Sequence, residues 1–137
     1  MNRNRILGAL ALSVAFMLPT SPFAAQRKSG HAWAWGFGRN GELGLGSESN
    51  SSLPQPIKNL TFIDIDSKRN LSAGITPDGK LFTWGKNRNG ALGHLPANLN
   101  VLIPRLVELS DRVAQVSCGY QNVCIVTEKG EAYVWGL

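Results

Sequence analysis

Short apolar segments separated by turn-forming residues make up the chain from residue 32 onward. Two stretches, 71–84 and 123–135, share one pattern: an apolar segment, a short turn that ends in glycine, and a segment rich in aromatic and β-branched residues. The turns lie at 77–79 and 128–130, and their glycines can adopt the positive φ that tight turns require. Aromatic and β-branched residues favour strands. The pattern therefore predicts two β-hairpins.

Two further segments extend the predicted hairpins into sheets. Apolar and acidic residues alternate over 62–66, which is typical of a strand with one face in water, and 113–118 is its counterpart in the next unit. No segment beyond residue 25 shows a sustained period of 3.6 residues, so no further helix is expected. The chain beyond residue 25 is therefore predicted to be all-β.

The first 25 residues follow a different pattern. Arg3 and Arg5 supply positive charge, and an uncharged, mostly apolar segment follows at 6–18. This segment has the length of the apolar region of a signal peptide, and it is too short to span a bilayer core about 30 Å thick. We predict a signal-peptide helix that is cleaved after Ala25, a secreted or periplasmic protein, and no stable membrane span after cleavage.

An internal repeat organises the rest of the chain. Trp-Gly pairs recur at 35–36, 84–85 and 135–136, at intervals of 49 and 51 residues, and the first two are followed by a shared Arg-Asn-Gly-x-Leu-Gly. Several strands within a period near 50 residues are typical of β-propeller blades. The structural signature of the repeat comprises Trp35, Gly36, Gly41, Leu43, Gly44, Trp84, Gly85, Gly90, Leu92, Gly93, Trp135 and Gly136.

The repeat resembles a known family. Trp-Gly-x-Asn/Gly-x-x-Gly-x-Leu-Gly at 35–44 and 84–93, together with Val-Ser-Cys-Gly at 116–119, is similar to the regulator of chromosome condensation repeat family, a seven-bladed β-propeller in its complete form. The family includes an exchange factor for a small nuclear GTPase that also binds chromatin, and secreted relatives that inhibit β-lactamases. The resemblance implies a protein partner, and the export signal argues against the nuclear roles. Asn122 stands where the family often has histidine, and Ser67-Lys68 replaces one Cys-Gly.

The length of the chain limits how much of a propeller it can form. Cleavage would leave 112 of the 137 residues, which is just over two repeats, whereas propellers close with about 4–8 blades. We predict a linker at 26–31 and an incomplete repeat array at 32–137 that forms about two four-stranded blades. Open blade edges favour self-association. The alternative is a truncated fragment of a longer propeller protein without independent function.

Charge and motifs narrow the function further. The formal net charge of +5 is spread along the chain, so no nucleic-acid partner is expected. Residues 36–41 match G-x-G-x-x-G, but no helix start follows, so we interpret them as a turn and expect no cofactor. Neither His31 nor His94 has the partners of a catalytic triad or a metal site nearby in sequence, so no catalytic or metal residue is predicted.

Two groups of side chains remain as candidates. The tryptophans of the repeat are expected to pack between blades rather than to form an open stacking platform. Trp33 is expected to have no counterpart in the repeat and to be either exposed or packed. Basic and amide residues lie on equivalent loops, where they would either contact a protein partner or form solvated turns. These candidate partner-binding residues are Arg39, Asn40, Lys86, Arg88 and Asn89.

Cys118 and Cys124 flank a short predicted turn, and two interpretations stay open: a cross-strand disulfide, or two small, buried, apolar side chains. Asp64 and Asp66 fall on one strand face, where they would either bind a cation or face water.

These observations favour an exported, non-enzymatic repeat module that mediates protein–protein interaction through propeller loops. An extracellular carbohydrate- or peptide-processing propeller enzyme is the alternative from another class. It would require a pair of carboxylates at a cleft.

Overall fold

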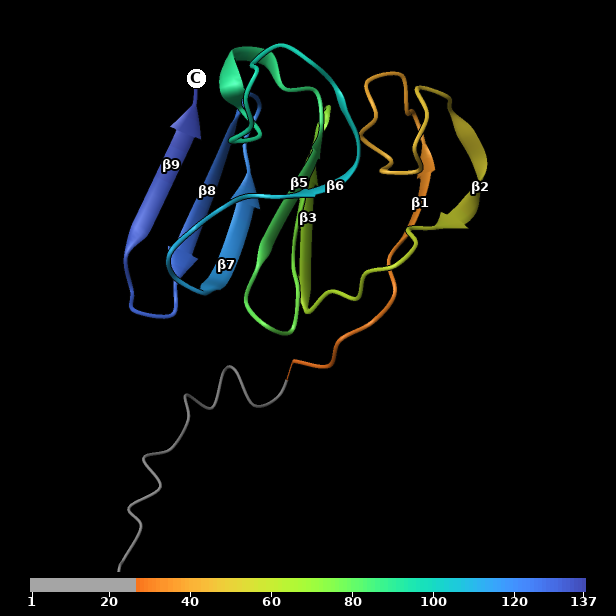
Figure 1. Ribbon diagram of the computed structural model, residues 1–137. Coiled ribbons are helices and arrows are strands. Elements are labelled where there is room, and N and C mark those ends of the chain that lie inside the picture. Colours follow the sequence, from red (N-terminus) through yellow and green to blue (C-terminus); the bar gives the residue numbers. More distant parts are fainter. Residues whose placement is uncertain (1–26) are drawn as a thin grey trace, which may run out of the picture.

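The computed structural model describes residues 27–137, so the predicted signal-peptide helix and its cleavage point lie outside the described residues. The described part folds into three antiparallel sheets that follow one another across Figure 1, from orange and gold through green to blue. The first sheet pairs β1 (Trp33–Gly36) with β2 (Ser51–Pro56). The second has the order β3 (Asp64–Lys68), β4 (Leu71–Ile75), β5 (Leu81–Gly85) and β6 (Val101–Leu106). The third has β7 (Val113–Cys118), β8 (Asn122–Thr127) and β9 (Ala132–Gly136), and a 3-10 turn, η1, spans Arg88–Gly90.

Both predicted hairpins are confirmed, as β4–β5 and β8–β9. The same hydrogen bond closes the two turns: the backbone N–H of Gly79 donates to the carbonyl of Thr76 at 2.9 Å, and that of Gly130 donates to Thr127 at 2.9 Å. Both glycines have positive φ, which is the backbone conformation expected of turn glycines. The predicted partner strands are found as β3 and β7.

Two strands were not identified from the sequence, namely β2 and β6. β2 contains Pro54 and Pro56, and β6 contains Pro104. Proline within a short segment argues against a strand because it cannot donate to the ladder. Each of these strands has a hydrogen-bonded neighbour on one side within the described residues, which is where proline is tolerated. The fold class predicted from the sequence, an all-β partial propeller, is confirmed.

The core lies between the sheets rather than within one of them. Between the first and second sheets, Ile57, Phe62 and Trp84 are buried together. A larger cluster lies between the second and third sheets, where the buried side chains come from β4, β5, β7 and β8 and the segment after β6. The second sheet thus presents one face to the first sheet and the other face to the third, as propeller blades do.

One tryptophan contact shows how neighbouring blades are joined. The indole Nε1–H of Trp84, on β5, donates to the carbonyl of Glu42 in the loop of the first sheet at 3.0 Å, and the side chain is 2% exposed. Gly44 lies directly against this indole, since a Cβ atom on Gly44 would be 2.8 Å from Nε1. A glycine at this position is therefore required by the close approach of the ring.

The expectation that all three repeat tryptophans pack between blades is wrong for one of them. Trp135 packs against the second core cluster, with Gly93 beside its indole. Trp35 is 60% exposed, because no blade precedes β1 in the described chain. The expectation that Trp33 has no counterpart in the repeat is also wrong: it occupies the position of Phe82, because Pro56 and Leu106 are the respective partners on β2 and β6. Its side chain is 58% exposed.

The cysteines are not bonded to each other. Cys118 pairs in register with Val123, whereas Cys124 pairs with Ser117, so the two side chains point to opposite faces of the β7–β8 ladder. Cys118 is buried against the second sheet, and burial raises the pKa of its thiol to about 12. The disulfide interpretation of the sequence is therefore corrected: both cysteines are free thiols, with Cys124 exposed.

The residues just before β1 belong to the folded body. Within the predicted linker 26–31, the described part is held against the second sheet by an ion pair between Arg27 and Asp64 at 3.2 Å. An antiparallel β-bridge between Gly30 and Phe62 also fixes it. Asp66 accepts a hydrogen bond from the backbone N–H of Cys118 at 2.7 Å, so the acidic residues of β3 face β7 rather than open water. Over residues 27–137, no helix is long and apolar enough to cross a membrane.

Candidate functional site

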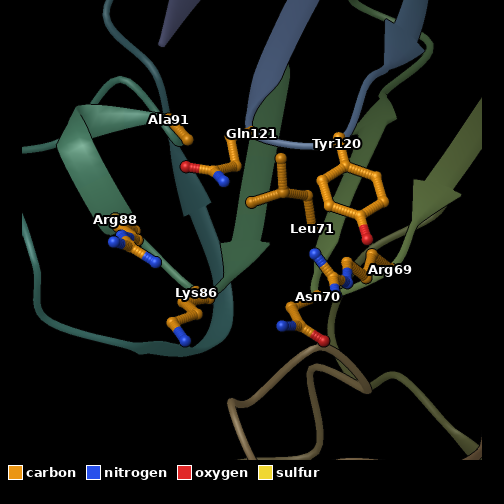
Figure 2. Close-up of a pocket in the computed structure, with 8 residues that line it drawn as sticks. All are labelled: Arg69, Asn70, Leu71, Lys86, Arg88, Ala91, Tyr120 and Gln121. Carbon is orange, nitrogen blue, oxygen red and sulfur yellow. The ribbon is translucent and has the colours of Figure 1, made fainter. Parts of the chain in front are cut away.

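Three turns converge at one end of the second and third sheets and enclose a small basic pocket. They are the β3–β4 turn, the segment from the end of β5 into η1, and the β7–β8 turn. The cavity holds about 50 Å³, far less than the 300–1,000 Å³ of a pocket for a whole small molecule. Its lining residues are Arg69, Asn70, Leu71, Lys86, Arg88, Ala91, Tyr120 and Gln121 (Figure 2).

Arg69 and Tyr120 form one side of the pocket. They occupy the same position in successive turns, because Ser67 pairs with Ser72 in the second sheet as Cys118 pairs with Val123 in the third, and each lies two residues after that position. Arg69 has a positive φ of 56°, which the tight β3–β4 turn imposes. Its guanidinium carbon lies 3.9 Å from the ring centroid of Tyr120, a cation–π contact that holds the arginine across the boundary between two blades.

Lys86 and Arg88 form the opposite side. The backbone N–H of Lys86 donates to the carbonyl of Asn70 at 2.8 Å, which fixes the exit of β5 against the β3–β4 turn. Between them Asn87 points into the fold and is 1% exposed: its Nδ2 donates to the carbonyl of His94 at 2.9 Å, and its Oδ1 accepts from the backbone N–H of Leu92 at 3.0 Å. The buried amide thus fixes the segment on which Lys86 and Arg88 stand.

The pocket is positively charged, and no acidic side chain in its lining neutralises that charge. None of its lining residues is acidic, and no ion pair involves Arg69, Lys86 or Arg88 within residues 27–137. Leu71 and Ala91 give it an apolar floor, at 3% and 1% exposure (Figure 2). Three cations around a cavity of this size favour the carboxylate end of an acidic side chain or another small anionic group.

The structure brings together only part of the set chosen from the sequence. Lys86 and Arg88 line the pocket, and the neighbouring Asn89 reaches Gln121, with Nδ2 and Oε1 3.5 Å apart. Arg39 instead stands over Phe37 of the first sheet's loop, 5.9 Å from the ring centroid. Asn40 is engaged with Glu42, whose carboxylate accepts its backbone N–H at 2.7 Å. Equivalent positions in the repeat therefore have different surroundings.

Arg69 and Tyr120 were missed as site residues. They lie in turns outside the repeated Trp-Gly motif, and the two residue types differ from each other although their positions match. The signal was available in the strand pattern: the predicted strands 62–66 and 113–118 both lead into these turns, so both turns had to lie at the same end of neighbouring blades.

Other parts of the described chain offer less chemistry. A groove of about 620 Å³ between β2 and β6 is lined mainly by apolar side chains, with Lys58 as its charged residue. His94 is buried, with its Nε2 2.9 Å from Oγ1 of Thr83, and burial together with the charge of Arg105 lowers its pKa. Within residues 27–137, no three His, Cys, Asp or Glu side chains are grouped so as to hold a metal ion.

Sequence comparison finds the repeat of this chain in other proteins. The family model for the regulator of chromosome condensation (RCC1) repeat matches residues 29–67 and 78–126. The chain is 34% identical over 116 residues to the human E3 ubiquitin-protein ligase HERC2, a match that covers 79% of this chain and 2% of that protein. It is 34% identical over 113 residues to the ultraviolet-B receptor UVR8 of Arabidopsis thaliana, covering 79% of this chain and 26% of the receptor.

Solved structures share the arrangement of the blades. Human WBSCR16 matches with a TM-score of 0.73 and 26% identity, over 78% of this chain and 28% of its own. Yeast RCC1 (Prp20), in a crystal with Kap60, matches with a TM-score of 0.65 and 18% identity, over 77% of this chain and 27% of its own. Prp20p of Saccharomyces cerevisiae, described with its binding to Gsp1p and histones, gives 0.62 at 19% identity. The chain spans about a quarter, or less, of the length of these relatives.

Proposed function

Because this chain belongs to the regulator of chromosome condensation repeat family, we propose that it is an exported, non-enzymatic module that binds an acidic segment of another protein at its basic pocket. The observation that carries the proposal is the group of three cations, Arg69, Lys86 and Arg88, around a cavity of about 50 Å³ with no acidic residue in its lining. A Glu or Asp side chain of a partner fits both the charge and the size.

The kind of interaction follows from the exposure of the site. Lys86 is half-buried, while Arg69 and Arg88 are exposed, so each contact with a partner carboxylate is worth about 0.2–1 kcal/mol. Three such contacts give a modest affinity that falls as salt rises, and they contribute mainly to the rate and orientation of association. The remaining affinity comes from partner residues that cover Tyr120 and the surrounding turns.

A partner of protein nature is supported by the relatives. Yeast RCC1 (Prp20) is bound to Kap60 in its crystal, and Prp20p is described with its binding to Gsp1p and histones. The lining of the pocket lacks the pair of carboxylates that a glycosidase requires. Export is supported by the charged and apolar pattern of residues 1–25.

Binding can be tested with a fluorescein-labelled peptide rich in Glu and Asp, followed by fluorescence anisotropy. The variant Arg69→Gln/Lys86→Gln/Arg88→Gln should bind this peptide about 5- to 50-fold more weakly than the wild type at low salt. The matched control Lys28→Gln/Arg39→Gln/Lys58→Gln removes the same charge from residues outside the pocket and should bind nearly as well as the wild type. Equal losses in both variants would mean that net charge, and not this pocket, attracts the peptide.

Export can be tested separately by expressing the full-length chain in a bacterium and measuring the intact mass of the protein in each compartment. A periplasmic or secreted form that begins at Gln26 is expected. A full-length form found only in the cytoplasm would contradict the export part of the proposal.

A further inference from the structure

Strands β1 and β9 occupy the same position in their blades, but each has a different neighbour. The register of β1 with β2 matches that of β5 with β6, since Gly36 pairs with Ser51 as Gly85 pairs with Val101. The register of β9 with β8 matches that of β5 with β4, since Gly136 pairs with Asn122. Within residues 27–137, β1 pairs only with β2, and the edge that β9 uses to pair with β8 is free in β1. Conversely, β9 pairs only with β8, and the edge that β1 uses to pair with β2 is free in β9.

The two strands are also alike in sequence and backbone conformation. Residues 32–36 read Ala-Trp-Ala-Trp-Gly, and residues 132–136 read Ala-Tyr-Val-Trp-Gly. The glycines at their ends have φ values of +102° and +103°. Either segment therefore fits the edge of β8 with an aromatic residue, a small or β-branched residue, a tryptophan and a glycine in the same order.

The faces that these strands present are uncovered. Trp33 and Trp35 are 58% and 60% exposed, whereas Trp84 at the position of Trp35 is 2% exposed. On the third sheet Val134 is 63% exposed, whereas Thr83 at the equivalent position is 0% exposed. Exposed apolar side chains on unpaired strand edges favour association with another strand.

We propose that β1 and β2 of a second copy of this chain replace β9 against β8. The exchange gives a four-stranded sheet in the order β7–β8–β1–β2, which is the strand order of the complete second sheet. It puts Trp35 of the incoming copy in the place of Trp135, beside Gly93 and between two blades. The exchange replaces the β8–β9 ladder with a β8–β1 ladder, so the number of ladders per chain is unchanged and the gain is a four-stranded sheet with a blade of each copy beside it.

The arrangement is head-to-tail. A copy that donates β1 and β2 to one neighbour still offers its own β8 to another, so the contact is heterologous and extends to rings or open chains rather than stopping at a symmetric pair. Within one chain β9 competes at an effective concentration in the mM range. Association should therefore increase steeply with protein concentration.

A single cysteine substitution reports the exchange. In the third sheet Cys124 lies opposite Val134. Ala34 has the position of Val134, because it pairs with Gln55 as Thr83 pairs with Arg105. In the exchanged sheet, Ala34→Cys of one copy therefore lies directly opposite the native, exposed Cys124 of the other.

The test is to oxidise concentrated full-length Ala34→Cys protein with oxidised glutathione and to separate it on a non-reducing gel. We expect a ladder of disulfide-linked dimers and larger species in which mass spectrometry finds a bond between residues 34 and 124. The ladder should disappear in Ala34→Cys/Cys124→Ser. It should also be absent from Ser52→Cys, which places a thiol on exposed β2 away from β8. Cross-linking no greater than in Ser52→Cys, or a ladder that persists without Cys124, would overturn the proposal.

Sedimentation velocity tests the same exchange without a new thiol. Trp35→Gln changes a side chain that is 60% exposed in the single chain and should leave its thermal unfolding nearly unchanged, but should weaken self-association about tenfold or more, since a buried tryptophan is a typical hot spot. Self-association equal to that of the wild type would contradict the exchange, as would a wild type that stays monomeric at concentrations approaching the mM range.

Discussion

The contact between a tryptophan of one blade and a glycine of the preceding blade can be measured with a graded series of substitutions. Gly44, Gly90 and Gly93 have similar backbone conformations, with φ of +68°, +71° and +76°. A Cβ atom on Gly44 would lie 2.8 Å from Nε1 of Trp84. On Gly93 it would lie 3.2 Å from Nε1 of Trp135, and on Gly90 it would meet no atom within 4 Å. The three positions therefore share the backbone cost of alanine and differ in the steric cost.

The backbone cost of a non-glycine residue in the left-handed region is about 1–2 kcal/mol, and this is the whole effect expected for Gly90→Ala. Gly44→Ala adds the cost of overpacking, about 1–3 kcal/mol, for a total of about 2–5 kcal/mol. The indole cannot move aside easily, because Trp84 is 2% exposed and its indole N–H donates a hydrogen bond to the carbonyl of Glu42. Its ring centroid also lies 5.8 Å from that of Phe62. Gly93→Ala should fall between the other two, since its contact is looser and Trp135 is half-buried.

The free energies of unfolding would be measured by urea denaturation followed by tryptophan fluorescence, with equal slopes required for the comparison. The expected order of stability is wild type, Gly90→Ala, Gly93→Ala and Gly44→Ala. If Gly44→Ala were no less stable than Gly90→Ala, the packing of tryptophan on glycine would not be what joins the first two blades.

Three further predictions concern single side chains. Asn87→Ala should lower the free energy of unfolding by about 2–4 kcal/mol, because it leaves buried backbone groups of the turn unpaired. Asn100→Ala removes only an exposed hydrogen bond to Glu48 and should change it by less than about 0.5 kcal/mol in the same urea assay; equal effects would contradict the role given to Asn87. At about pH 8 a maleimide should label Cys124 quickly and Cys118 only after unfolding, because Cys118 is buried and burial raises the pKa of its thiol to about 12. Labelling would be located by mass spectrometry, and finding both cysteines or neither of them labelled in the native protein would contradict this prediction. Burial lowers the pKa of His94 below its usual 6.5, so the unfolded chain binds a proton at this histidine more tightly than the folded chain does. The free energy of unfolding should therefore fall as the pH drops from 6.5 through the folded-state pKa. When urea curves are compared across pH, His94→Gln should lack the part of this pH dependence that comes from His94.

The sequence predicted the repeat and the hairpins well because both depend on local chemistry. Glycines at 79 and 130 mark turns, and the alternating segments beside them can form strands whatever lies around them. The strands β2 and β6 could not be recognised in this way. They contain Pro54 and Pro104, and their strand conformation depends on pairing with β1 and β5.

The site was harder to predict because it lies between blades. Lys86 and Arg88 were found because they belong to the repeated motif, whereas Arg69 and Tyr120 become neighbours only when two turns are brought to the same end of adjacent sheets. The same limit explains Trp35. A repeat position indicates packing only when a neighbouring blade is present to cover it, and β1 has none before it in the described chain.

The most direct test of the proposed function is to locate the bound acidic peptide by NMR. Isotope-labelled full-length protein would be titrated with the Glu- and Asp-rich peptide, and the amide chemical shifts would be followed. The largest changes are expected in the three turns around the pocket, at 69–71, 86–91 and 120–121, and they should be lost in Arg69→Gln/Lys86→Gln/Arg88→Gln. Changes centred on the loop of the first sheet around Arg39, or spread evenly over all basic residues, would contradict the proposed function.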